Sequence, residues 1–272
     1  MQIEAAHRWA TGENIRIAVI DTGVDTQHPD LVGQFSVIED FVEGAESFTN
    51  DIHGTAVAGV IAALADNNQG IVGIAPEAKL ITLKACWPEQ PYKLEAVCDS
   101  LSLAQALNAV VELKPEILNM SLTGPPDPLL SRLLDKVFEQ GTIVIAADDS
   151  QTDQISAFPA SMDRTIAVRM NGIQAFTKPT WITAPGSEIL ATLPHGTYDF
   201  MSGSSFAAAH VSGTVALLLE LQPNISSEQV LELLRSSVNP QSKRPESANM
   251  INACAAIAKL KGQSVVCPPS SA

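Results

Sequence analysis

The alternation of short apolar runs with longer segments of helical periodicity most constrains what this chain can fold into. Runs rich in valine, isoleucine and leucine predict buried strands at residues 15–20, 79–84, 116–122, 142–147 and 165–168. Between them, helical spacing occurs at residues 53–64, 102–113 and 129–140. Because helices that connect parallel strands cover both faces of a sheet, the pattern predicts an α/β fold with three αβα layers and a mainly parallel central sheet.

Capping signals indicate where several of these helices begin and end. Gly141 follows the segment 129–140, at the position where a left-handed glycine commonly ends a helix. Ser102 with Gln105, and Ser226 with Gln229, have the spacing of capping boxes. The second of these predicts a further helix near the C-terminus.

Length and composition fit one domain of this class. The chain has 272 residues, of which 46% are apolar, and no repeat or linker divides it, so we expect residues 1–272 to form a single domain with 263–272 as a surface tail. With 30 acidic against 16 basic residues, a nucleic-acid partner is not expected. We find no uninterrupted apolar run of the roughly 18 residues that a membrane span needs, and we expect a monomer.

The four cysteines fall into two local pairs, Cys86 with Cys98 and Cys254 with Cys267. Neither pair is a CxxC motif or has a histidine at zinc-ligand spacing, so a metal site is not favoured. Two disulfides, Cys86–Cys98 and Cys254–Cys267, are the preferred interpretation, and they imply an oxidising compartment, extracellular or periplasmic. Four reduced cysteines, some of them buried, remain the alternative.

Three polar residues stand at the ends of apolar segments. Asp21 follows the first predicted strand, at the carboxyl edge of the sheet, where open α/β folds form their sites. His53 and Ser205 each begin a segment of small apolar residues. Each residue alone has an ordinary structural interpretation as a turn or helix cap. Together, in the order Asp, His, Ser, they match the needs of acyl transfer by a serine nucleophile.

The segments around these residues resemble the subtilisin-like serine peptidases, or subtilases. The similarity covers residues 15–221 and is carried by DTGVD at 21–25, HPDL at 28–31, HGT at 53–55, GIVGIAP at 70–76, LNMSL at 118–122, APG at 184–186 and GSS at 203–205. The resemblance implies a subtilisin-like fold and a serine endopeptidase with the triad Asp21, His53 and Ser205. It also implies an acyl-enzyme intermediate and no cofactor for the chemistry.

The resemblance assigns the substrate-binding residues as well. Ser121, Leu122 and Thr123 would pair with the backbone of an extended polypeptide substrate, while Ala147 and Ala157 would line the pocket for the residue before the cut. A pro-segment or an inhibitor would be a further partner of the same groove.

The sequence departs from the family at the oxyanion hole, where subtilases usually supply an asparagine. Residues 145–150 read IAADDS, so an ungapped alignment places Ser150 at that position and a one-residue gap places Asp149 there. The backbone N–H of Ser205 is expected to contribute in either case. Asp149 could donate only when protonated, which would shift activity toward acid pH. The Asp148-Asp149 run keeps open the alternative of a weakened or inactive scaffold that binds peptides. A non-peptidase acyl hydrolase is a further alternative.

Two further regions are left open by the sequence. Asp30 and Asn67 lie in segments that resemble a calcium site of the family, although a solvated turn fits them equally well. The segment 86–98 replaces small and glycine-rich residues of the family with bulkier ones, among them Trp87 and Tyr92. It would either narrow the substrate groove on the side before the cut or form a remote surface loop.

Overall fold

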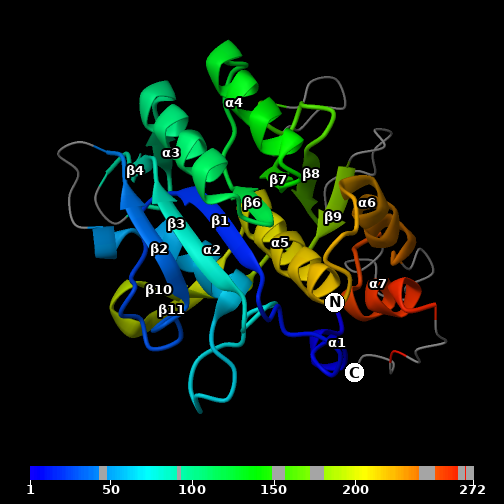
Figure 1. Cartoon of the computed structure of the whole chain (residues 1–272). Coiled ribbons are helices and arrows are strands. Elements are labelled where there is room, and N and C mark those ends of the chain that lie inside the picture. Colours follow the sequence, from blue (N-terminus) through cyan, green and yellow to red (C-terminus); the bar gives the residue numbers. More distant parts are fainter. Residues whose placement is uncertain are drawn as a thin grey trace.

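The computed structural model describes residues 1–42, 48–90, 93–148, 157–171, 181–238, 249–262 and 267 (Figure 1). A seven-stranded sheet lies at its centre, in the order β2-β3-β1-β6-β7-β8-β9, with every neighbouring pair parallel. The strands are β1 (Arg16–Asp21), β2 (Phe35–Asp40), β3 (Lys79–Lys84), β6 (Ile117–Met120), β7 (Ile143–Ala147), β8 (Ile166–Met170) and β9 (Trp181–Ala184). Two antiparallel hairpins lie outside the sheet, β4 (Cys86–Pro88) with β5 (Ala96–Cys98), and β10 (Ile189–Leu193) with β11 (Thr197–Met201).

Helices cover both faces of the sheet, which confirms the three-layer α/β architecture (Figure 1). Successive strand residues point to opposite faces. Ile17 and Val19 of β1 accordingly join the core with α2 (Ile52–Ala62) and α5 (Ser204–Leu221). Ala18 and Ile20 join the core with the helices of the other layer. Those helices are α3 (Ser100–Leu113) and α4 (Pro128–Glu139).

Shorter helices and two 3-10 turns complete the structure. They are α1 (Ile3–Ala6), α6 (Ser227–Ser236) and α7 (Ala253–Leu260), together with the 3-10 turns η1 (Phe48–Asn50) and η2 (Pro194–Gly196). Helix α7 packs against α1, α5 and α6. The predicted disulfides Cys86–Cys98 and Cys254–Cys267 are both present; the first joins β4 to β5 and the second ties α7 to the residues that follow it.

The helix ends agree with two of the three capping predictions. Ser226 and Gln229 form a capping box at the start of α6, and Gly141 follows α4 with a left-handed φ of 86°. The capping box predicted at Ser102 is wrong. Helix α3 begins two residues earlier because the carboxylate of Asp99 accepts the N–H of Ser102 at 2.8 Å and takes the cap position itself.

Helix α5 has the length and mean hydropathy of a membrane span, although polar residues such as His210 and Glu220 interrupt its apolar run. It is the only such helix in the part of the chain that the structure describes, and 78% of it is buried inside the protein. In this fold α5 is a core helix that packs on β6, β7 and β8.

Candidate active site

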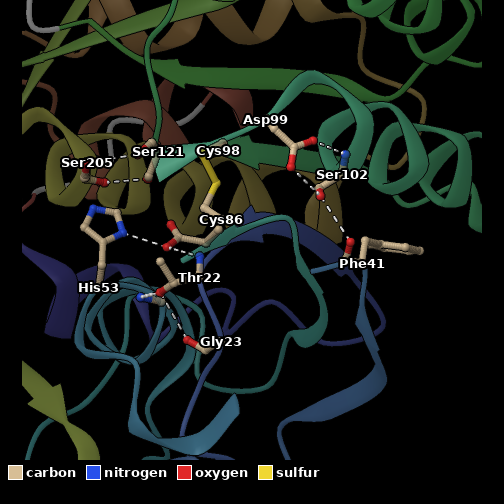
Figure 2. The surroundings of a disulfide bond; sticks show 12 residues. Thr22, Gly23, Phe41, His53, Cys86, Cys98, Asp99, Ser102, Ser121 and Ser205 are labelled. Atoms are coloured by element: carbon tan, nitrogen blue, oxygen red, sulfur yellow. Dashed lines mark hydrogen bonds and ion pairs between the residues drawn. A yellow bond between two sulfur atoms is a disulfide. The ribbon is translucent and has the colours of Figure 1, made fainter. Parts of the chain in front are cut away.

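Asp21, His53 and Ser205 come together at one cavity, although they lie far apart in the sequence. Asp21 is the last residue of β1, and His53 and Ser205 are each the second residue of their helices, α2 and α5. All three line a cavity of about 550 Å³. Figure 2 shows the side chains of His53 and Ser205 beside Ser121, near the end of β6. The parallel sheet and two helix starts therefore build the site.

His53 and Asp21 form a short hydrogen bond within the protein. Nδ1 of His53 donates to Oδ1 of Asp21 at 2.6 Å, and the side chain of Asp21 is only 3% exposed. The backbone N–H of Thr22 donates to the same oxygen at 2.7 Å. A proton held on Nδ1 leaves Nε2 as the basic nitrogen of the ring. The arrangement therefore fixes the tautomer that a general base needs.

The hydrogen bond between His53 and Asp21 requires α2 to lie close to the turn after β1. A Cβ atom at Gly54 would lie only 2.4 Å from the carbonyl oxygen of Gly23, closer than real contacts allow. The N–H of Gly54 donates to the hydroxyl of Thr22 at 3.0 Å. Glycine at position 54 therefore lets the helix that carries His53 touch the turn that follows Asp21.

A buried ion pair, which the sequence analysis missed, supports the same region. Nζ of Lys84 lies 2.5 Å from Oδ2 of Asp51, and their side chains are 1% and 6% exposed. The N–H of Gly23 donates to the same carboxylate oxygen at 2.7 Å. Lys84 ends β3 in register with Asp21 of β1. The pair thus joins the end of β3, the turn after β1 and the start of α2.

Ser205 exchanges two hydrogen bonds with Ser121. Its hydroxyl donates to the carbonyl oxygen of Ser121 at 3.2 Å, and the hydroxyl of Ser121 donates to the carbonyl of Ser205 at 3.1 Å (Figure 2). The amide of Asn119 donates to the Ser121 hydroxyl at 3.0 Å, and the hydroxyl of Ser212 donates to Asn119 at 2.8 Å. Asn119 and Ser212 are fully buried. A chain of hydrogen bonds from the core of α5 therefore holds the start of that helix against the end of β6.

Comparison with known proteins identifies the family to which this arrangement belongs. Residues 12–252 match the Subtilase family.

The chain is a subtilase.

It is 37% identical over 241 residues to the "Major intracellular serine protease" of Bacillus subtilis (strain 168), covering 79% of this chain and 72% of that protein. It is 34% identical over 248 residues to Subtilisin E of the same organism, covering 84% of this chain and 61% of the relative. Fervidolysin from Fervidobacterium pennivorans, a keratinolytic enzyme related to subtilisin, superimposes with a TM-score of 0.78 at 27% identity, covering 94% of this chain and 45% of its own. This subtilase is a serine-type endopeptidase, and members of the family need no cofactor for catalysis.

The structure places some of the predicted substrate-binding residues of this subtilase at the cavity. The cavity that Asp21, His53 and Ser205 line is also lined by Ser121, Leu122 and Thr123. Ala147 ends β7 and is buried, but neither it nor Ala157 is among the residues that line this cavity. Their assignment to the pocket before the cut therefore stays a prediction.

The oxyanion-hole candidates Asp149 and Ser150 lie outside the described residues. Their neighbour Asp148 has a structural partner, because its carboxylate lies 3.1 Å from the guanidinium of Arg169. Both side chains are fully buried. The ion pair with Arg169 therefore gives Asp148, the first of the two consecutive aspartates, a structural role. The backbone N–H of Ser205 lies in the first turn of α5, where N–H groups have no acceptor within the helix.

The residues at the predicted calcium position do not fit a cation. The buried carboxylate of Asp30 accepts hydrogen bonds from the side-chain amide of Asn67 at 2.8 Å, the N–H of Ile71 at 2.9 Å and the hydroxyl of Tyr198. Calcium needs oxygen atoms that face it, whereas here the carboxylate faces donors. Among the described residues, moreover, no cluster of three or more His, Cys, Asp or Glu could hold a metal.

Tyr198 is expected to stabilise the segment that contains Asn67 and Ile71, through its hydrogen bond to Asp30 and without calcium. Burial and the neighbouring Asp30 raise the pKa of Tyr198 to about 12. This pKa is above that of an unfolded tyrosine, about 10. The contribution of the neutral Tyr198 hydroxyl to the free energy of unfolding should therefore be complete below pH 10 and be lost as pH rises through about 12. Tyr198→Phe should lower the free energy of unfolding by about 1–3 kcal/mol at neutral pH, while EDTA should leave the melting temperature unchanged.

Urea denaturation of both proteins, and thermal melts with EDTA or calcium, check this expectation. Phenylalanine is a suitable replacement because it keeps the ring that contacts His28 edge-on, with centroids 5.1 Å apart. A melting temperature that falls in EDTA and recovers with calcium would show that a cation, rather than Tyr198, stabilises this segment.

Proposed function

We propose that this chain hydrolyses peptide bonds through an acyl-enzyme intermediate on Ser205, with His53 as the general base and Asp21 as its partner. The observation that supports this most strongly is the 2.6 Å hydrogen bond from Nδ1 of His53 to Asp21, in a cavity that Ser205 also lines. The bond leaves Nε2 of His53 to accept the proton of the serine. A scaffold that only binds peptides is not favoured.

The proposed reaction has two steps that use the same residues. Oγ of Ser205 attacks the carbonyl carbon of the substrate while its proton passes to Nε2 of His53, and Asp21 stabilises the imidazolium that forms. His53 then gives this proton to the leaving amine. In the second step, His53 takes a proton from water while the water oxygen attacks the acyl carbon. The bond to Oγ of Ser205 then breaks, and His53 returns the proton to this oxygen.

The negative charge on the substrate oxygen would be stabilised at the start of α5. The N–H of Ser205 and the positive end of this 18-residue helix supply one part of the oxyanion hole. We propose that Asp149 or Ser150 supplies the other donor. Since loss of such a donor costs roughly 100- to 1000-fold in turnover, a protonated Asp149 would confine activity to acid pH, whereas Ser150 would not.

Polypeptides in extended conformation are the proposed substrates, bound along Ser121, Leu122 and Thr123, which line the cavity. A pro-segment or an inhibitor would occupy the same groove. The two disulfides support function in an oxidising compartment, extracellular or periplasmic. Both apolar cores lie against one sheet, which supports a single domain over residues 1–272.

Digestion of a peptide library tests this proposal. The wild type and the Ser205→Ala variant are incubated with the library from about pH 4 to pH 10, and the products are identified by mass spectrometry. The wild type should produce internal cuts that the variant does not. Tight peptide binding without cleavage at any pH, or hydrolysis of esters alone, would overturn it.

A further inference from the structure

The hydroxyl proton of Ser205 is engaged with Ser121 in this structure. The hydroxyl donates to the carbonyl oxygen of Ser121 at 3.2 Å (Figure 2). Because a hydroxyl group has only one proton to donate, the same proton is not donated to His53 in this arrangement. The proposed attack, however, needs that proton to pass to Nε2 of His53. The structure therefore shows a resting orientation of Ser205, and its side chain must rotate before it reacts.

The backbone of Ser205, in contrast, is held in place. The hydroxyl of Ser121 donates to the carbonyl oxygen of Ser205 at 3.1 Å and accepts a hydrogen bond from the amide of Asn119 at 3.0 Å. The hydroxyl of Ser212, further along α5, donates to Asn119 at 2.8 Å, and both of these side chains are fully buried. The change that releases the Ser205 proton is therefore confined to rotation about its Cα–Cβ bond.

The hydrogen bond that holds the Ser205 hydroxyl is long. Its 3.2 Å exceeds the distance of about 2.7–2.8 Å that is usual for O–H···O bonds. An intramolecular hydrogen bond of ordinary net strength favours the bonded form by roughly threefold to tenfold. A minor fraction of the molecules therefore has the hydroxyl released at any moment, and a competing donor can raise this fraction.

A competing donor can reach the carbonyl of Ser121 from the cavity, which Ser121 lines together with His53 and Ser205. Cys86 and all three residues of β5 line this cavity as well, so the interpretation of the segment 86–98 as a remote surface loop is wrong. An amide N–H that approaches the Ser121 oxygen weakens the attraction of that oxygen for the serine proton. The backbone of a polypeptide carries such N–H groups, whereas a simple ester has none.

We propose that Ser121 is a positioning residue that directs the Ser205 hydroxyl away from His53 until an amide N–H of the substrate occupies the Ser121 carbonyl. This inference rests on the proposed function of the same site. The substrate N–H displaces the hydroxyl, which rotates and donates to Nε2 of His53, the arrangement from which it attacks. A peptide thus activates the nucleophile that cleaves it. A small ester without an N–H reacts only with the fraction already released.

The test measures how fast Ser205 is labelled by methanesulfonyl fluoride, a small reagent without an N–H group. Labelling is followed by mass spectrometry with and without N-acetyl-alanyl-alanine N-methylamide, at a concentration that fully inhibits peptide cleavage. The terminal N–H of this peptide can occupy the Ser121 carbonyl, while no carbonyl group follows it to fill the reaction centre. The matched control is the N,N-dimethylamide, which lacks this N–H, and His53→Ala serves as the control without the base.

We expect the N-methylamide to accelerate labelling of Ser205 by roughly threefold to tenfold, which is the factor by which the resting hydrogen bond is favoured. The N,N-dimethylamide should not accelerate it, and neither peptide should accelerate labelling of His53→Ala, which has no base to accept the released proton.

Three results would overturn the inference while leaving the proposed function intact. They are an N-methylamide that inhibits cleavage without accelerating labelling, equal acceleration by both peptides, and acceleration that persists in His53→Ala. Wild type that is neither labelled on Ser205 nor able to cleave any peptide would overturn the proposed function itself.

Discussion

Replacing Ser205 by alanine is expected to lower kcat for peptide hydrolysis by about a million-fold, with KM changed only a few-fold. The hydroxyl is the proposed attacking group, while the groove that holds the substrate backbone stays intact. Because the three proposed catalytic residues act as a unit, His53→Ala/Ser205→Ala should be no less active than Ser205→Ala alone. Steady-state kinetics on the purified variants measure both effects.

Ser204→Ala is the matched control for this experiment. Ser204 is the neighbouring serine of α5, and its hydroxyl accepts the N–H of Met170 at 3.3 Å. We expect less than a 10-fold change in kcat, with a melting temperature that falls slightly. Substantial peptide hydrolysis by Ser205→Ala would contradict the assignment of the nucleophile, since residual catalysis by the remaining site is small.

Replacing Lys84 by methionine is expected to lower the free energy of unfolding by about 3–5 kcal/mol. The substitution leaves the carboxylate of Asp51 buried without its cation, and such an uncompensated charge is strongly destabilising. Adding Asp51→Asn should restore part of the loss, because the amide carries no charge and its oxygen can still accept the N–H of Gly23. Urea denaturation followed by circular dichroism measures the three stabilities.

Lys79→Met on the same strand is the control. Lys79 is exposed, and its Nζ donates to the carbonyl of Gly33 at 3.0 Å, so we expect a loss within about 1 kcal/mol. The interpretation of the buried pair would be contradicted if Lys84→Met were as stable as Lys79→Met, or if Asp51→Asn brought no recovery in the double variant.

The central strands were predictable from sequence because burial on both faces makes a strand a continuous apolar run. Residues 79–84 match β3 at both ends, and residues 142–147 match β7 to within one residue. Strand β2 was missed because it lies at the edge of the sheet, where half-buried and exposed residues alternate, and its sequence FSVIED does not follow that alternation, since Ile38 is 50% exposed. Strands β4 and β5 have three residues each, too few for any periodicity to be recognised.

The residues proposed to react were predictable from their motifs, but most of the contacts that stabilise the surrounding structure were not. Asp51 and Lys84 lie 33 positions apart, and a lysine at the end of a strand is usually on the surface. Ser212 and Asn119 lie 93 positions apart. Asp30 and Asn67 were found as a pair, but the decisive contact comes from Tyr198, on a distant hairpin. Such contacts are set by tertiary packing, which local patterns do not encode.

Covalent labelling tests most directly whether the surroundings of Ser205 make it a nucleophile. The wild type and His53→Ala are incubated with a fluorophosphonate, digested and mapped by mass spectrometry. We predict one adduct per chain, on Ser205 of the native wild type, and at least a thousandfold slower labelling in His53→Ala, because the histidine must accept the serine proton. No adduct on Ser205, or equal labelling rates in the two proteins, would contradict the proposed catalytic unit.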